Sequence, residues 1–140
     1  MSFHFDFRVY YEDTDASGVM YHARYLAFFE RARTEYLRAA GFDQEYLMRA
    51  HDIAFTLSDL GVRYRRPARL DDELRVGVQV ERLGAASVVF LQSMHRRADG
   101  EHLAEARVRA GCVRFSDFSA TRMPEALRQA LHQQRIAHVL

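Results

Sequence analysis

The feature of this sequence that most restricts its fold is a change in the spacing of its apolar residues. Between about Arg24 and Ala40, apolar side chains recur every three or four residues, which is typical of a helix with a broad apolar face. Gly41 follows, where a left-handed residue commonly ends a helix. From residue 53 to residue 115, apolar and polar residues alternate instead, as in half-buried strands. A helix this apolar must be covered by those strands.

The alternating region divides into four expected strands separated by turn-forming residues. They cover approximately 53–64, 74–80, 88–94 and 103–115. Asp99-Gly100 is a strong hairpin signal between the last two. Inside the first range, the alternation changes phase near Ser58–Asp59, which indicates a β-bulge, a device frequent beside functional sites.

The remaining segments complete an α+β pattern. Alternating phenylalanines at 3, 5 and 7 predict a strand before the long helix, and shorter helices are expected over 44–50 and from Pro124 onward. The order is therefore a strand, a long helix and four antiparallel strands joined by short turns. This order predicts a long central helix packed on an antiparallel sheet.

The composition excludes several classes of protein. The chain of 140 residues is the size of one domain, over 1–140, and its net charge of +1 without a long basic run argues against a nucleic-acid partner. All 20 basic residues are arginine, so a lysine Schiff base and pyridoxal-phosphate chemistry are excluded. Lys and Asn, which have AT-rich codons, are both missing, and this favours a GC-rich bacterial genome.

Other common chemistries lack their motifs. Cys112 is the only cysteine, which excludes an internal disulfide and a thiolate zinc site. The glycines form no phosphate-binding loop and the histidines show no metal-ligand spacing, so we expect no cofactor and no metal. No signal peptide and no apolar run long enough to span a membrane are present, so a cytoplasmic protein is expected.

Three carboxylates stand directly before the long helix, at Glu12, Asp13 and Asp15, and Gly18 and His22 follow. Acidic residues before a helix suit its dipole, and two aspartates so spaced could also hold magnesium. Alternatively, the first-turn amides could polarise a carbonyl while a carboxylate acts as nucleophile or base. Gly18 would let the backbone approach a ligand, and His22 could bond the loop or the substrate. The spacing alone favours the capping role.

The stretch RVYYEDTDASGVMYHARYLAFFERAR at 8–33 resembles the signature of the hotdog-fold thioesterases of the 4-hydroxybenzoyl-CoA thioesterase group. It is especially similar to the acyl-CoA thioesterases associated with the bacterial Tol–Pal system. Similarity continues through PARLDD at 67–72 and to about Phe115. The resemblance implies a hotdog fold, in which a five-stranded antiparallel sheet wraps a long central helix. It also implies hydrolysis of acyl-CoA to free acid and CoA.

The resemblance also implies a site. The family's essential aspartate falls on Asp15, its glycine on Gly18, and its carbonyl-polarising backbone amide on His22. Family members are dimers or tetramers with the site between protomers, so this chain is expected to be a homo-oligomer, a dimer or a tetramer of dimers. The expected substrate-binding residues are Gly18, Val19, Tyr21, Tyr25, Asp59, Leu60, Gly61 and Ser87.

One departure from the family pattern affects the substrate. The turn LGAAS at 83–87 lacks the basic residue that relatives often direct at the nucleotide of coenzyme A, although Ser87 is retained. An acyl carrier protein is therefore an alternative thioester donor. Candidate replacements for the missing charge are Arg65, Arg66, Arg96, Arg97 and Arg114. Two alternatives to hydrolysis stay open, which are hydration or dehydration of an acyl thioester and a non-catalytic binding module.

Overall fold

The computed structural model describes residues 3–139, with side chains described as far as residue 135. Residues 1, 2 and 140, which the expected single domain over 1–140 includes, lie outside the described residues. The elements follow one another as β1 (Phe3–Arg8), a 3-10 helix η1 (Tyr11–Asp13), α1 (His22–Ala39), α2 (Gln44–His51), β2 (Ile53–Tyr64), β3 (Glu73–Leu83), β4 (Ser87–Arg96), β5 (His102–Arg114) and α3 (Glu125–Val139).

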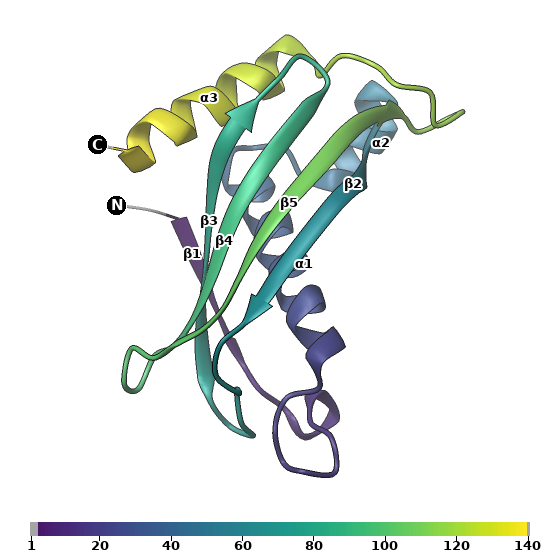
Figure 1. Ribbon diagram of the computed structural model, residues 1–140. Helices are drawn as coiled ribbons and strands as arrows, with labels where there is room; N and C mark the ends of the chain where they lie inside the picture. The colour runs from purple at the N-terminus through teal and green to yellow at the C-terminus, as the bar shows by residue number, and fades with distance from the viewer. Residues whose placement is uncertain (1–2, 140) are drawn as a thin grey trace.

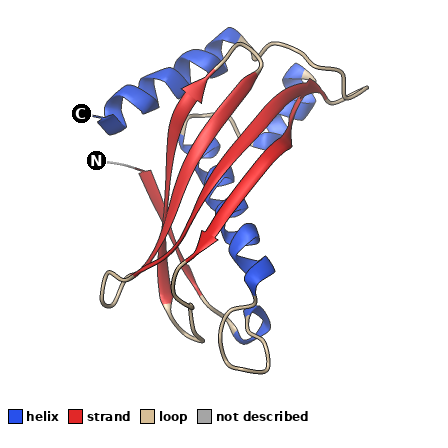
Figure 2. Cartoon of the chain, viewed as in Figure 1, coloured by secondary structure: helices blue, strands red, loops and turns tan. Residues whose placement is uncertain are grey.

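The five strands form one antiparallel sheet in the order β1-β3-β4-β5-β2. Figures 1 and 2 show this sheet as one twisted layer, with α1 running along one of its faces. The expected arrangement of a strand, a long helix and four antiparallel strands is therefore confirmed. Its α+β class follows from the change of apolar spacing, because the helical stripe and the inward faces of the strands bury one another.

The long helix begins two residues before the expected start and ends at Ala39, one residue before the expected end, and Gly41 follows as the predicted terminator. Gly41 has φ +92°, a left-handed conformation. The amide of Gly41 donates to the Arg38 carbonyl at 3.0 Å, and the amide of Phe42 donates to the Leu37 carbonyl at 3.0 Å. This pair of bonds is a Schellman motif, which satisfies carbonyls that the end of a helix leaves unpaired.

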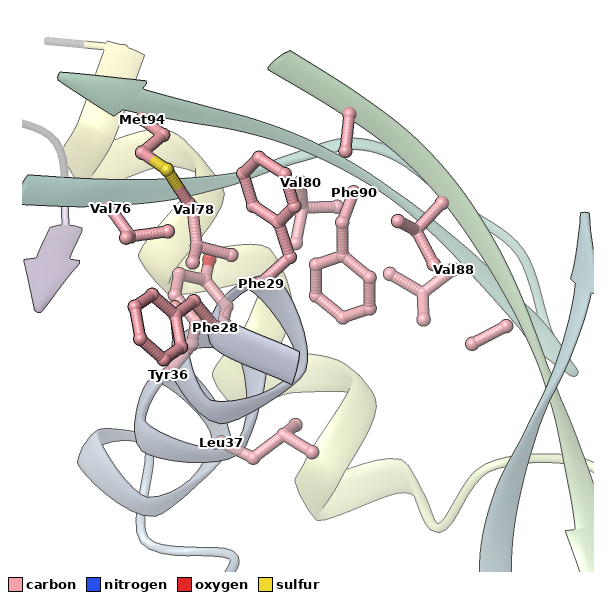
Figure 3. Packing of buried hydrophobic residues seen from close by; sticks show 14 of the residues in the cluster. Phe28, Phe29, Tyr36, Leu37, Val76, Val78, Val80, Val88, Phe90 and Met94 are labelled. Atoms are coloured by element: carbon pink, nitrogen blue, oxygen red, sulfur yellow. The ribbon is translucent and has the colours of Figure 1, made fainter. Parts of the chain in front are cut away.

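The core lies between α1 and the sheet. In Figure 3, Phe28, Phe29 and Tyr36 of α1 lie beside Val78 and other sheet residues. These side chains belong to one buried cluster. Burial of a large apolar side chain stabilises a fold by about 1.5–3 kcal/mol. The cluster therefore fixes the position of α1, and with it the position of the loop that leads into α1.

The bulge predicted near Ser58–Asp59 is confirmed. The pairing of β2 with β5 shifts register between Leu57 and Asp59, so Ser58 is the extra residue. The Ser58 hydroxyl donates to the Arg109 carbonyl at 3.2 Å and accepts a bond from Arg109 Nη1 at 2.7 Å. The bulge keeps Leu57 and Leu60 on one face although they are three positions apart.

The two edges of the sheet differ. β1 pairs with β3 only as far as Val78, and α3 lies beside the end of β3 that extends further (Figure 1). Arg135 Nη2 of α3 donates to the Glu81 carbonyl of β3 at 2.8 Å. At the opposite edge, β2 is twelve residues long and has strand β5 on one side only. Leu57 of β2 is 51% exposed in the single chain.

Candidate active site

Asp13 anchors the base of the loop that joins η1 to α1. Its carboxylate is buried, and its Oδ1 accepts bonds from Arg24 Nε and Nη2, each at 2.8 Å. Its Oδ2 accepts the amide of Tyr10 at 2.9 Å, and its carbonyl accepts the amide of Tyr21 at 2.9 Å. Asp13 therefore ties both ends of the loop to the first turns of α1.

Asp15 lies two positions further on and faces solvent in the single chain. Its Oδ1 accepts the amide of Ser17 at 2.8 Å and the hydroxyl of Ser17 at 2.5 Å. These bonds hold the pKa of Asp15 below its usual value, because they stabilise the ionised form. The carboxylate is thus oriented and ionised without a cationic partner among the described residues.

Gly18 closes the tip of the loop. Its amide donates to the Asp15 carbonyl at 3.1 Å, and the amide of Asp15 donates to the Val19 carbonyl at 3.0 Å. Gly18 has φ +82°, a conformation that favours glycine. The predicted need for glycine at this position is therefore explained by the turn itself, since a Cβ there would meet no atom within 4 Å.

A neighbouring segment supports the same loop. Val19 forms a β-bridge with Arg69, and the amide of Met20 donates to the Ala68 carbonyl at 2.7 Å. The amide of Ala68 in turn donates to the hydroxyl of Tyr25 at 2.9 Å. Tyr25 is buried, and burial raises its pKa. Its hydroxyl is therefore occupied in holding segment 67–72 against α1.

The amino end of α1 lies directly after this loop. Tyr21 precedes the helix and His22 is its first residue, and their exposed rings lie 4.4 Å apart. The amides of the first helical turn lack partners within the helix, and the helix dipole makes this end partly positive. The Tyr64 hydroxyl donates to the His22 carbonyl at 2.9 Å, which joins the end of β2 to the start of α1.

The other predicted site residues lie elsewhere in the single chain. Asp59, Leu60 and Gly61 are exposed on β2 directly after the bulge. Ser87 pairs with Gly111, whereas Tyr64, which contacts the helix start, pairs with Ala104 near the other end of β5. The chain therefore brings Asp15, Gly18, Val19, Tyr21 and His22 into one loop-and-helix unit, but it does not bring Ser87 to that unit.

Three residues of this unit were missed by sequence reasoning. Ser17 orients Asp15, and the spacing of an aspartate and a serine two positions later was an available signal for this local turn. Arg24 and Tyr64 gave no such signal, because their partners lie 11 and 42 positions away in sequence.

The arrangement suits chemistry on a polarised carbonyl. An ionised carboxylate lies in the loop that ends at the partly positive start of a helix, which is the combination expected for attack on an acyl carbon. Within residues 3–139, no group of three or more His, Cys, Asp or Glu side chains is placed to hold a metal ion. Nor does any helix in that range combine the length and apolar character needed to cross a membrane.

The candidate arginines differ in their freedom to bind a ligand. Arg65 and Arg66 follow Tyr64 and line a shallow surface hollow together with Arg63 and His102. Arg65 pairs with Glu105 at 2.9 Å, and Arg66 pairs with Glu101 at 3.3 Å.

By contrast, Arg96 is mostly enclosed and donates to Asp72 and Asp99 and to the Pro67 carbonyl. Arg97 pairs with Glu73 at 2.7 Å. Arg114, at the end of β5, is exposed. Arg65 and Arg66 are thus the candidates next to the helix start.

Known proteins match this chain over most of its length. The family model described as "Thioesterase-like superfamily" matches residues 9–131. The acyl-CoA thioesterase YbgC of Haemophilus influenzae is 43% identical, over 93% of this chain and 94% of that protein. The acyl-CoA thioester hydrolase YbgC of Escherichia coli is 48% identical, over 79% of this chain and 81% of that protein.

A solved structure agrees with the fold. A probable thioesterase from Bartonella henselae is 33% identical and has a TM-score of 0.83, over 89% of this chain and all of that one. This match and the sheet packed around α1 confirm the expected hotdog architecture. Because the family model covers the loop, α1 and every strand after it, the chain belongs to the thioesterase-like superfamily.

Proposed function

We propose that this protein hydrolyses acyl-CoA thioesters to the free acid and CoA. The observation that carries the proposal is the ionised carboxylate of Asp15, fixed by Ser17 in the loop that leads to the start of α1. The names of the relatives described above, which are acyl-CoA thioesterases or thioester hydrolases, support the same activity.

In this proposal the thioester carbonyl oxygen docks at the first-turn amides around Tyr21 and His22. Negative charge that develops on the oxygen is stabilised there. Asp15 then acts in one of two ways. As a base, it takes a proton from water, the water oxygen bonds to the acyl carbon, the C–S bond breaks, and the proton passes to the sulfur. As a nucleophile, its oxygen bonds to the acyl carbon and the C–S bond breaks, which gives a mixed anhydride and the CoA thiolate. Water then hydrolyses the anhydride, which restores the Asp15 carboxylate, and a proton from water passes to the thiolate.

Single-turnover hydrolysis in oxygen-18 water tests the anhydride route. Oxygen-18 in Asp15 after one turnover requires that route, because water then attacked the aspartyl carbon of the anhydride. An unlabelled Asp15 and a labelled product acid mean that water attacked the acyl carbon of the substrate, as the general-base route requires.

The alternative of hydration or dehydration lacks support from the site. That chemistry commonly needs a histidine acting with an acid, whereas the Asp15 carboxylate bonds Ser17 and not His22. The thiol-release experiment described below distinguishes a non-catalytic binding module from a hydrolase.

We also propose that two copies of the chain associate through β2. The strand offers twelve residues with an unpaired edge, and Leu57, Leu60 and Tyr64 are exposed along it. Such an edge is a template for pairing with another strand. Association there would place Asp59, Leu60 and Gly61 at a subunit interface. A tetramer of dimers, a cytoplasmic location, a link to Tol–Pal and a single domain over 1–140 stay predictions.

The nucleotide of CoA is proposed to lie against Arg65 and Arg66, since these arginines directly follow Tyr64, the residue that contacts the helix start. Charge-assisted bonds to phosphate would replace their exposed ion pairs. If acyl carrier protein is the donor instead, its acidic surface would meet the same arginines. A comparison of acyl-CoA with acyl carrier protein as donor separates these two substrates.

The test of the function is thiol release from short, long and aromatic acyl-CoAs, with water addition to an enoyl-CoA followed in parallel. Release of CoA from at least one class at a rate well above buffer is expected. Binding of every acyl-CoA without release of thiol would establish a binding module, and water addition without thiol release would establish a hydratase. Either result would overturn the proposal.

A further inference from the structure

A second hollow lies between α1, α2 and β2, away from the amino end of α1. Its volume is about 300 Å³, at the lower end of the range for small-molecule sites. Glu30, Gln44 and Leu57 are exposed at its mouth. Its deeper walls are buried apolar side chains, namely Leu37, Leu47, Ile53, Phe90 and Ala110. The lining suits an apolar chain.

One wall of this hollow carries a positive charge. Arg33 lines the hollow although it is only 9% exposed. Its Nη1 donates to Gln92 Oε1 at 2.8 Å, and Gln92 Nε2 donates to the Phe29 carbonyl at 2.8 Å. Gln92 therefore fixes the guanidinium against the helix backbone. Burial lowers the pKa of Arg33, and the negative charge of Glu30 opposes this effect.

Among the residues that the structure describes, one acceptor, Gln92 Oε1, is found for this guanidinium. An arginine side chain has five N–H donors, and a buried charge is stable only when it is paired or well bonded. In the described part of the chain, Gln92 is the polar partner of Arg33, and no carboxylate lies within ion-pair distance. The Nε and Nη2 atoms of Arg33 are not fully enclosed, so both remain accessible to solvent.

We propose that this hollow receives the far end of the acyl group and that Arg33 binds a carboxylate there. The preferred substrates are then CoA thioesters of dicarboxylic acids, and this inference rests on the proposed hydrolysis. A carboxylate would complete the donor set of the guanidinium with charge-assisted bonds, which a methyl group cannot do.

The length of the helix sets the length of the acyl group. Arg33 is 11 positions after His22, the first residue of α1, and a rise of 1.5 Å per residue places them about 16 Å apart along the axis. An extended alkyl chain advances about 1.3 Å per C–C bond because its bond angles are tetrahedral, so roughly a dozen bonds cover this separation. Dodecanedioyl-CoA and dodecanoyl-CoA are therefore the matched pair of substrates, since they differ only at the far end.

The test compares kcat/KM for these two thioesters. We expect the wild type to prefer dodecanedioyl-CoA by about tenfold or more, because one charge-assisted bond is added at a buried position. Arg33→Met should lose this preference, because the methionine side chain cannot bind a carboxylate. Arg31→Met, which removes an exposed arginine of the same helix, is the control and should keep the preference.

Arg33→Lys covers the case in which the methionine variant does not fold. It retains the charge without the fork of donors, so it should show a weaker preference in the same direction. Equal kcat/KM values in the wild type would overturn the proposal. A preference that survives in a folded Arg33→Met protein would also overturn it. If the subunits of that protein separate while the preference survives, the role of Arg33 is in subunit packing.

A binding measurement separates this inference from the proposed function. Calorimetric titration with monomethyl dodecanedioate and methyl dodecanoate needs no hydrolysis, and only the first of these carries a carboxylate. Tighter binding of monomethyl dodecanedioate to the wild type, lost in Arg33→Met, supports the Arg33 site even if no thioester releases thiol. Equal binding of both esters overturns it, even if thioesters are hydrolysed.

Discussion

The loop before α1 contains two aspartates, two positions apart, whose surroundings are opposite. Asp13 at the base is buried and bonded to the Arg24 guanidinium, whereas Asp15 near the tip is exposed and bonded to Ser17. A buried, paired carboxylate is suited to holding a structure, and an exposed, ionised one is suited to meeting a substrate. The anchoring and catalytic interpretations of the acidic stretch therefore apply to different residues of the same loop.

The largest effect should come from the tip. Asp15→Asn preserves the shape and the acceptor for Ser17 but removes the carboxylate, and we expect kcat/KM for acyl-CoA to fall roughly 100- to 10,000-fold. Thiol release measures this change. Glu12→Gln, which alters an exposed carboxylate of the same loop, should keep the wild-type rate. A wild-type rate in Asp15→Asn would show that the Asp15 carboxylate takes no part in the reaction.

The base of the loop should respond in stability instead. Asp13→Ala leaves the Arg24 guanidinium without its buried partner, and we expect the free energy of unfolding to fall by about 2–3 kcal/mol. Urea denaturation measures the loss, and Asp15→Ala is the control, with an unchanged midpoint. If the two substitutions destabilise equally, the division of the loop into an anchoring base and a reactive tip is wrong.

Gly18 tests whether the tip depends on its backbone conformation. Gly18→Ala forces a residue with a Cβ to adopt φ +82°, which costs about 1 kcal/mol or more. Thermal unfolding should reveal this loss, and Gly18→Asn should recover part of it because asparagine tolerates the left-handed region. Since a Cβ meets no atom within 4 Å, equal stability of the alanine variant would mean that the loop relaxes to another conformation.

The smallest effect concerns pH. Ser17 lowers the pKa of Asp15, so Ser17→Ala should raise it toward its usual value. Activity that needs the ionised carboxylate is lost as pH falls through this pKa, and the acid limb of kcat/KM should therefore move to higher pH while the rate at neutral pH is kept. Ser119 bonds Asp117 in the same way, so Ser119→Ala is a matched control. If the acid limb does not move, Ser17 does not control the ionisation of Asp15.

Most of the fold could be predicted from the sequence because the sequence patterns that indicate it are local. The spacing of apolar residues defined α1, the change of phase located the bulge at Ser58, and Gly41 marked the helix end. Each of these features depends on residues a few positions apart. They could therefore be read without knowing which strands are neighbours.

The site was less predictable because its contacts are distant in sequence. The burial of Asp13 depends on Arg24, and the place of Ser87 depends on the register of β4 with β5. Arg33 did leave a signal that was missed. It lies four positions from both Phe29 and Leu37, on the apolar stripe of α1, where a charged residue requires an explanation.

The position of α3 limits how large an assembly can grow. If copies join along β2, the opposite edge of each sheet, formed by β1, must not accept another copy, because the joined sheets would otherwise polymerise. There, α3 shields the end of β3, and β1 is a strand of only six residues. Short or covered edges discourage further pairing. In the proposed association along β2, the C-terminal helix would thus block further pairing at the other edge, so that two copies form a closed pair instead of a fibre.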